Sequence, residues 1–357
     1  MKFAIACGGT GGHTFPGLAT GRALLARGHE VEVFSAGREI EGSTLKGWDG
    51  PVFGMGAPKS PAHHPFAFTA SVRRTLRHLR ANRPDALLAM GSYASLPPVI
   101  AARILGIPIV LHEANAVPGK AIAFLSRLAS AIAITFPGTE RHFSRGAHVV
   151  QTGLPVRTEL LDQPPFALQP SDSQPTTIFI TGGSQGAYEM NRRVAEALAT
   201  LAARSGAPRF RVIHQTGNHE DAVEATRRRY AEAGIEAIVE PFITTMGGAY
   251  KVADLVIARA GAATCAEIAL FGKPALFIPL PTAVRDHQFL NAKHLADGGA
   301  ALVMRQEDCA PAPLADAIGD LLASPSRLTA MSEASKALAA PDAATRLAEL
   351  LEKTPTP

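Results

Sequence analysis

The chain has 357 residues, of which 46% are hydrophobic and 18% charged, and its formal net charge is +4. This length is enough for two domains with separate cores, and the composition is that of a folded protein. The sequence predicts no membrane-spanning helix, because its longest candidate stretch, 96–111, is shorter than the ~20 residues such a helix needs and contains three prolines and Arg103. The first apolar run stops at Gly8, so we also expect no secretion signal.

The cysteines indicate the cellular compartment, and the aromatic content bears on the kind of partner the protein binds. Cys7, Cys265 and Cys309 form no C-x-x-C pair, which favours a reducing compartment and buried thiols. Only 6% of the chain is aromatic and no basic motif is interleaved with aromatic residues, so we expect no nucleic-acid partner. The weak positive charge fits a nucleotide phosphate or an anionic lipid equally well.

The N-terminal segment combines a strand-length apolar run, 3–7, with a glycine turn from Gly8 to His13 (GGTGGH) and a helical pattern that follows. Glycine permits positive φ angles and a close approach of a ligand, and the N–H groups at a helix start attract anions. The pattern predicts a phosphate-binding turn. A tight connection without a ligand is the alternative.

A strand is predicted over 30–34 and a basic amphipathic helix over 66–83, where five arginines surround an apolar stripe. Such a helix either lies on an anionic membrane surface or packs on the sheet with a solvated basic face. The side chains expected to contact a membrane are Phe66, Phe68, Val72, Arg73, Leu76, Leu79 and Arg80.

Short apolar strands are predicted at 85–90, 107–111, 131–135 and 149–152, each ending in a polar or glycine-containing turn. This alternation of strand, turn and helix is typical of a parallel sheet with helices on both faces. Ligands of such sheets collect at the carboxyl ends of the strands.

The alternation of strand, turn and helix starts again after residue 175. Residues 163–175 contain four prolines and are interpreted as a linker between a first domain, 1–162, and a second domain, 176–341. A strand over 177–181 leads into a second glycine turn, 182–187. Two glycine turns in equivalent places indicate an α/β protein with two Rossmann-like domains that face a cleft.

The second half continues with predicted strands at 210–214, 237–239, 255–258 and 275–278. After the third of these, Arg259 to Glu267 turns into a helix, and Glu267 is a candidate acceptor for a pair of sugar hydroxyls. A carboxylate that only favours the helix dipole is the alternative. A last helix, 342–353, with Asp342 as its N-cap, is expected to cross back to the first domain.

Several phosphate-binding motifs are absent from the sequence. The first turn lacks the third glycine of a dinucleotide fingerprint, and the second strand ends in Phe34-Ser35-Ala36 without an acidic residue. Gly119-Lys120 and Gly272-Lys273 lack the Ser or Thr of a P-loop, and no D-x-D pair is present. We therefore expect a metal-independent diphosphate site without a cofactor, in which N–H groups and helix dipoles neutralise the charge.

Six motifs carry a resemblance to a known family. In chain order they are Gly8 to His13, His112-Glu113-x-Asn115, Gly153-x-Pro155-Val156-Arg157, Gly182 to Ala187, Arg259-x-Gly261-Ala262-x-Thr264-x-x-Glu267 and Asp286-His287-Gln288-x-x-Asn291-Ala292. Together they resemble MurG, the peripheral-membrane N-acetylglucosaminyltransferase family of bacterial peptidoglycan synthesis. The resemblance implies a GT-B fold, whose C-terminal half binds UDP-N-acetylglucosamine and whose N-terminal half binds the lipid-linked muramyl-pentapeptide, lipid I.

The resemblance also implies roles for single residues. Ser184 would contact the diphosphate, Ile243 the uracil through its backbone, the segment 262–267 the ribose and phosphate, and Gln288 the sugar. The implied donor-binding residues are Thr10, Gly11, Gly12, Asn115, Arg157, Ser184, Ile243, Ala262, Ala263, Thr264, Cys265, Ala266, Glu267 and Gln288. The implied acceptor-binding residues are Gly9, Ser92, Tyr93 and Ser95.

His13 is the family's candidate base. The muramyl 4-hydroxyl attacks the anomeric carbon with inversion, which requires a base, and a neutral imidazole accepts a proton near pH 7. A hydrogen bond from His13 to the acceptor phosphate is the alternative role. The product would be lipid II, made at the cytoplasmic face of the bacterial inner membrane. Expected partners are UDP-N-acetylglucosamine, lipid I, anionic lipids of the cytoplasmic leaflet and other cell-wall synthesis proteins.

The chain departs from the family pattern at four positions: Ser92 replaces a common glycine, Ala114 a glutamine, Leu154 an asparagine and Ala260 a serine. These departures leave three alternatives open. They are another GT-B transferase with a different acceptor, a UDP-N-acetylglucosamine 2-epimerase, and a non-catalytic nucleotide-sugar-binding protein of the cell-wall machinery.

Overall fold

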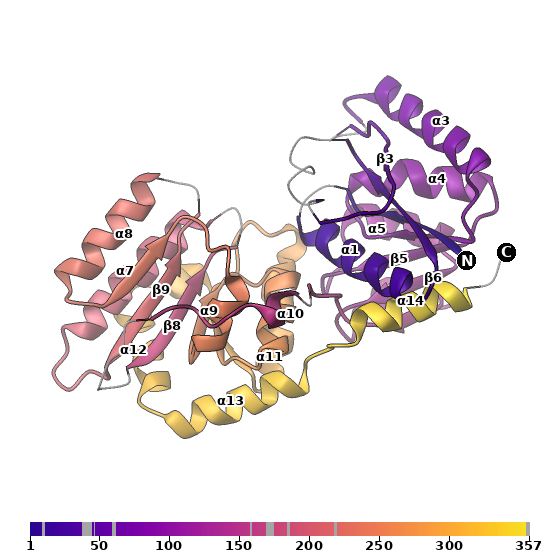
Figure 1. Ribbon diagram of the computed structural model, residues 1–357. Helices are drawn as coiled ribbons and strands as arrows, with labels where there is room; N and C mark the ends of the chain where they lie inside the picture. The colour runs from indigo at the N-terminus through magenta and orange to yellow at the C-terminus, as the bar shows by residue number, and fades with distance from the viewer. Residues whose placement is uncertain are drawn as a thin grey trace. The chain divides into compact units, whose positions relative to one another are not determined.

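The computed structural model of the chain (Figure 1) describes residues 1–8, 11–37, 45, 47–58, 62–157, 159–168, 175–183, 186–217 and 220–354. Two compact units make up the chain: Met1–Arg157 with Ala340–Pro357, and Thr158–Ala339. Each unit has its own parallel sheet. This confirms the predicted α/β class with two Rossmann-like domains.

The first unit contains a seven-stranded sheet of order β3-β2-β1-β4-β5-β6-β7, in which all neighbours are parallel. Its strands are β1 (Lys2–Ala6), β2 (Glu30–Ser35), β3 (Val52–Gly54), β4 (Ala86–Ala89), β5 (Ile109–Glu113), β6 (Ala131–Ile134) and β7 (Val149–Gln151). Strands β4, β5 and β6 are buried along their whole length. Helices therefore cover both faces, as continuous apolar runs predict.

The helices of this unit are α1 (Gly11–Ala26), α3 (Pro65–Ala81), α4 (Leu96–Ile104), α5 (Lys120–Leu125) and α14 (Ala343–Lys353), with short 3-10 turns η1 (Tyr93–Ser95), η2 (Ser126–Leu128) and η3 (Thr139–His142). Alternate residues of β1 point to opposite faces. Phe3 and Ile5 share a core with α1 and α14, while Ala4 and Ala6 share one with α3, α4 and α5. Helices α1 and α14 lie side by side (Figure 1).

Helix α3 packs on the sheet through a polar contact that determines its orientation. The His78 imidazole stacks on the Phe53 ring at 3.8 Å, and its Nε2 lies 2.9 Å from both carboxylate oxygens of Glu32. Leu79 is 0% exposed and Leu76 packs against the same core. Leu79 is therefore not a membrane-contact residue, because its side chain faces the sheet.

The second unit contains a six-stranded parallel sheet of order β10-β9-β8-β11-β12-β13. Its strands are β8 (Thr176–Thr181), β9 (Phe210–Gln215), β10 (Ala237–Glu240), β11 (Leu255–Ala258), β12 (Ala275–Phe277) and β13 (Ala301–Val303). Its helices are α6 (Glu159–Asp162), α7 (Tyr188–Ala202), α8 (Glu220–Glu232), α9 (Met246–Val252), α10 (Ala262–Leu270), α11 (His287–Asp297), α12 (Pro311–Leu322) and α13 (Pro325–Ala337), with 3-10 turns η4 (Val284–Asp286) and η5 (Gln306–Asp308).

Two segments differ from their interpretation in the sequence. The start of the expected linker, 163–175, lies inside the second unit, where the Gln163 side chain accepts a hydrogen bond from Gly247 N at 2.7 Å. Asp342 stands at the start of α14, but its carboxylate pairs with Arg346 at 2.7 Å and caps no backbone N–H. Among the described helices, none has both the length and the apolar character needed to cross a bilayer.

The return of α14 to the first unit suggests a stability test. Leu347 is fully buried in the core it shares with Phe3 and Ile5. Leu347→Ala should lower the free energy of unfolding of this unit by about 2–5 kcal/mol, because it leaves a cavity in that core. Thr345→Ala, on the exposed face of the same helix, is the matched control. Urea denaturation measures both variants, and equal midpoints would mean that α14 adds nothing to this core.

Candidate active site

In the first unit, His13 lies in the first turn of α1 and is held by the end of β4. Its Nδ1 donates a hydrogen bond to Met90 O at 2.8 Å. This bond places the ring proton on Nδ1, so the Nε2 lone pair is available to accept a proton. Burial lowers the pKa of His13 below its usual value, although the Met90 carbonyl opposes the shift. The imidazole is therefore neutral at pH 7.

The turn after β4 closes over the imidazole. Gly91 has a φ of +99°, and a Cβ at this position would lie 3.3 Å from His13 Cε1. Ser95 is buried, and its hydroxyl donates to Gly91 O. We therefore remove Ser95 from the acceptor set, because its side chain is used within the turn. Tyr93 is exposed, whereas Gly9 and Thr10 lie outside the described residues.

Ser92 occupies a backbone conformation that favours glycine. Its φ is 62° and its ψ 168°, a region in which side chains are strained. Its hydroxyl donates to Gly8 O at 2.9 Å and accepts from Ala94 N at 3.1 Å. These two bonds offset part of the strain, so the chain keeps the shape of a glycine turn in spite of the substitution.

The turn after β5 is organised by Glu113, a residue of the motif His112-Glu113-x-Asn115 for which the sequence predicted no role. The carboxylate is 3% exposed and accepts from Asn115 N at 2.9 Å, Asn115 Nδ2 at 3.3 Å and Gly119 N at 3.0 Å. Burial raises the pKa of Glu113 to about 6, against the effect of these N–H donors. Glu113 thus positions Asn115, one of the expected donor-binding residues.

The end of β5 and the segment after β7 carry two further residues of the expected motifs. His112 donates from Nε2 to Gly153 O at 3.0 Å, and burial lowers the pKa of His112 to about 4. The Arg157 guanidinium lies over the Phe15 ring, 4.2 Å from its centroid. Gly11 and Gly12 form the first turn of the helix that carries Phe15. The structure thus gathers these residues at the carboxyl edge of the first sheet.

In the second unit, the glycine turn joins β8 to α7. Gly183 has a φ of +81° and Gly186 a φ of +72°. A Cβ on Gly186 would lie 2.5 Å from Thr216 O, so only glycine fits there. Ser184, the residue expected at the diphosphate, lies outside the described residues.

Helix α10 begins after Gly261 at the same edge of the sheet, and the N–H groups of its first turn have no intrahelical acceptors. Glu267 lies in its second turn, where its carboxylate accepts from the buried Tyr250 hydroxyl at 3.1 Å. Ala262, Ala263, Thr264 and Ala266 also lie on this helix. Cys265 is buried and its N–H donates to Gly261 O at 2.9 Å, so we remove it from the donor set.

Two expected donor contacts are already bonded within the protein. Ile243 N donates to Gln215 Oε1 at 2.9 Å, and Leu280 N donates to Gln288 Oε1 at 3.1 Å. Gln215 was not recognised from the sequence. A polar residue at the end of a predicted strand gives no indication of the turn to which its side chain will hydrogen-bond.

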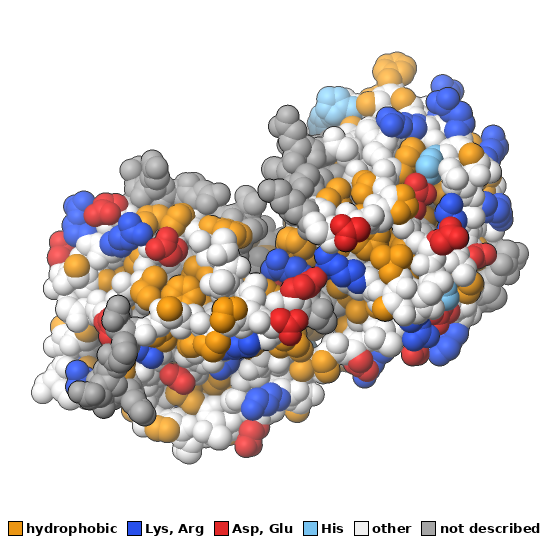
Figure 2. All heavy atoms as spheres, in the orientation of Figure 1, with side chains coloured by type: hydrophobic (Ala, Val, Ile, Leu, Met, Phe, Trp, Pro, Cys, Tyr) orange, Lys and Arg blue, Asp and Glu red, His pale blue; other side chains and the backbone are white. Residues whose placement is uncertain are grey.

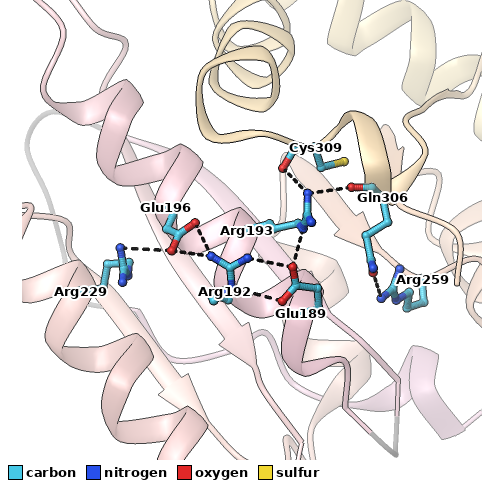
Figure 3. Close-up of polar contacts among 8 residues, drawn as sticks. All are labelled: Glu189, Arg192, Arg193, Glu196, Arg229, Arg259, Gln306 and Cys309. Carbon is cyan, nitrogen blue, oxygen red and sulfur yellow. Dashed lines mark hydrogen bonds and ion pairs between the residues drawn. The ribbon is translucent and has the colours of Figure 1, made fainter. Parts of the chain in front are cut away.

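A polar network connects the helices that begin at this edge (Figure 3). Arg259, at the end of β11, donates to Ile278 O and Pro279 O, both at 2.9 Å, and to the Gln306 side chain. Gln306 O in turn accepts from Arg193 on α7 at 2.9 Å. One glutamine therefore links Arg193, in the second turn of α7, to Arg259, three residues before α10 begins. On the surface the network continues through Glu189, Arg192, Glu196 and Arg229.

Comparison with known proteins gives the class first. The glycosyltransferase family 28 N-terminal domain matches residues 3–134, and the family 28 C-terminal domain matches residues 177–347. Together these matches span most of the chain and both of its sheets. The protein is thus a family 28 glycosyltransferase with two Rossmann-like units, as in GT-B enzymes.

Individual relatives narrow the class. The UDP-N-acetylglucosamine--N-acetylmuramyl-(pentapeptide) pyrophosphoryl-undecaprenol N-acetylglucosamine transferase of Halorhodospira halophila is 39% identical over 98% of this chain and 97% of its own. Its counterpart in Pseudomonas fluorescens SBW25 is 40% identical over 95% and 94%. The crystal structure of Acinetobacter baumannii MurG is 34% identical with a TM-score of 0.81, covering 99% of this chain and 100% of its own. The chain belongs to the MurG family.

Epimerases share only the fold. The UDP-GlcNAc 2-epimerase of Neisseria meningitidis is 13% identical with a TM-score of 0.71 over 99% of this chain and 100% of its own.

Among the described residues, no group of three or more His, Cys, Asp or Glu side chains is arranged to hold a metal ion.

The strained conformation of Ser92 can be tested with two variants. Ser92→Ala loses both hydroxyl bonds and keeps the positive φ, whereas Ser92→Gly loses the bonds and removes the strain. We expect the glycine variant to be more stable than the alanine variant by about 1–3 kcal/mol. Urea denaturation of the two proteins measures the difference. An alanine variant as stable as the glycine variant would show that this backbone carries no strain.

Proposed function

We propose that the protein transfers N-acetylglucosamine from UDP-N-acetylglucosamine to the 4-hydroxyl of the lipid-linked muramyl-pentapeptide, with inversion, to give lipid II. The observation that carries this proposal is the match to transferases named for this reaction over nearly the full length of both chains. In peptidoglycan synthesis, such an enzyme completes the disaccharide unit on its lipid carrier.

The mechanism assigns the nucleophile's proton to His13. A hydroxyl placed at Nε2 loses its proton to the neutral imidazole as the oxygen attacks the anomeric carbon. The bond from Nδ1 to Met90 O stabilises the imidazolium that forms. Glu113 keeps Asn115 and the start of α5 in place through three hydrogen bonds.

The leaving group is assigned to the second unit. The first turns of α7 and α10 direct backbone N–H groups and the positive ends of helix dipoles toward the diphosphate. Glu267, oriented by Tyr250, accepts from the ribose hydroxyls. We further propose that the site works without a metal ion, since helix starts supply the positive charge.

A transfer assay tests this function directly. The full chain is incubated with labelled UDP-N-acetylglucosamine and a short-chain lipid I analogue, with and without EDTA. We expect label in the lipid product in both reactions. UDP-sugar that binds without transfer would overturn the assignment, and a donor isomerised at C2 would indicate an epimerase. Loss of transfer in EDTA would contradict the metal-independent site alone.

The role of His13 can be tested by substitution. His13→Ala should lower kcat by a factor of about 100 or more, because the attacking hydroxyl loses its base. The lowered pKa of His13 predicts that kcat/KM in the native enzyme falls only at a pH below about 6.5, since a neutral imidazole is required. A rise in acceptor KM with unchanged kcat would assign His13 to phosphate binding instead.

We also propose that α3 contacts the anionic cytoplasmic leaflet of the inner membrane. Phe66 at its start is 90% exposed, and Arg73 and Arg80 lie on its solvent face. Lys and Arg side chains gather along α3 in Figure 2. Phe68 and Val72 are half-buried, and they complete the proposed surface at its edge.

Charge reversal on this helix tests the membrane contact. The double variant Arg73→Glu, Arg80→Glu should bind vesicles with anionic lipid at least about 10-fold more weakly, since each basic residue near such a surface contributes roughly 1 kcal/mol. Arg228→Glu, an exposed residue of α8, is the matched control. Vesicle sedimentation measures all of these proteins. Equal binding of the double variant and the native protein would rule out α3 as the membrane surface.

A further inference from the structure

Gln215, the last residue of β9, lies between two segments that the nucleotide is expected to contact. Its side chain is buried, 2% exposed. Oε1 accepts from Ile243 N at 2.9 Å, while Nε2 donates to Gly183 O at 3.2 Å and to Thr181 Oγ1 at 3.3 Å. One amide therefore joins the segment at the uracil to the turn at the diphosphate.

The orientation of this amide follows from its partners. A backbone N–H requires an acceptor, and a backbone carbonyl requires a donor, so Oε1 must face Ile243 and Nε2 must face Gly183. Glutamate cannot donate to Gly183 O, and methionine can form neither bond. The geometry therefore needs an uncharged group that donates and accepts at the same time.

The residues on either side of Gln215 hold the helix that follows the glycine turn. His214 Nε2 lies 3.2 Å from Asn191 Oδ1, and its Nδ1 lies 2.9 Å from the Tyr230 hydroxyl. Asn191 Nδ2 donates to Thr216 O at 2.7 Å. The end of β9 thus bonds both to the diphosphate turn itself, at Gly183, and to the helix after it, at Asn191.

We infer that Gln215 is a positioning residue that sets the distance and angle between the uracil-contacting segment at Ile243 and the diphosphate turn at Gly183. This inference rests on the proposed donor role of the second unit. UDP spans both segments, so its affinity depends on their relative placement. Uridine contacts only one of them and depends on this placement less.

The test compares Gln215→Met with the native enzyme. We expect the Kd of UDP and the KM of UDP-N-acetylglucosamine to rise about 10-fold or more, because the three hydrogen bonds to Ile243 N, Gly183 O and Thr181 Oγ1 are lost. The Kd of uridine and the KM of the lipid acceptor should change less than about 3-fold, because uridine contacts only one of the two segments and the acceptor contacts neither. Titration calorimetry and initial rates give these four quantities. If the methionine variant does not fold, Gln215→Glu keeps the bond to Ile243 N and should show the same selective loss of UDP affinity.

Val212→Ala is the matched control, because Val212 lies on the same strand and is buried in the core cluster, to which neither Ile243 nor Gly183 belongs. It should lower Tm without changing the ratio of the uridine and UDP affinities. Equal effects of Gln215→Met and Val212→Ala on this ratio would overturn the inference.

The Glu267→Ala variant distinguishes a wrong positioning role for Gln215 from a failure of the proposed function. If Glu267→Ala weakens UDP binding while Gln215→Met does not, the donor site stands and the positioning role is wrong. If the native chain binds no UDP, the proposed function itself fails.

Discussion

In both units, the turns that form the candidate site depend on polar side chains that are buried at strand ends and bond to the backbone of a neighbouring turn. Glu113 holds three N–H groups after β5, and Gln215 joins two turns after β9. A parallel sheet brings all its carboxyl ends to one edge, where turns meet with unpaired backbone groups. Burial makes each such bond costly to break, so a few side chains determine the shape of the whole edge.

Much of the fold follows from the sequence because its strands are short, apolar and buried on both faces. The runs at 255–258 and 30–34 became β11 and β2 with little change of boundaries. In the second glycine turn, Gly183 and Gly186 have the positive φ that glycine permits, whereas Gly11, Gly12 and His13 of the first predicted turn already belong to α1. Glycine turns are readable because their residue type follows from backbone geometry at the same position. The partners of Gln215 were not predictable, since Ile243 and Gly183 lie 28 and 32 residues away in the sequence. The partners of Glu113 lie only two and six residues further along the chain, but no pattern in the sequence shows that its carboxylate accepts from their N–H groups.

The basic helix α3 shows a different limit of sequence reasoning. Helical periodicity identifies which residues share a face, but not whether that face meets the sheet or the surroundings. Leu79 belongs to the apolar stripe and lies in the core, while Phe66 stands at the exposed start of the helix. The orientation of α3 is fixed by the contacts of His78 with Glu32 and Phe53. Hydrophobic periodicity cannot predict such a polar and aromatic cluster. The exposed basic face follows as a consequence.

The electrostatics of the second unit can be understood from Arg259. Its guanidinium is buried, three residues before the first residue of α10, and its direct partners are two carbonyl oxygens and an amide. Burial lowers the pKa of Arg259 to about 10, so the group stays charged at neutral pH. These neutral partners accept from both terminal nitrogens of the guanidinium without cancelling its charge, while the buried Nε has no hydrogen-bond partner. The positive potential therefore adds to the helix dipoles of α7 and α10 at this edge. A buried arginine bonded to neutral groups can thus add positive potential at the edge where the proposed donor diphosphate departs, a charge that a metal ion neutralises in other transferases.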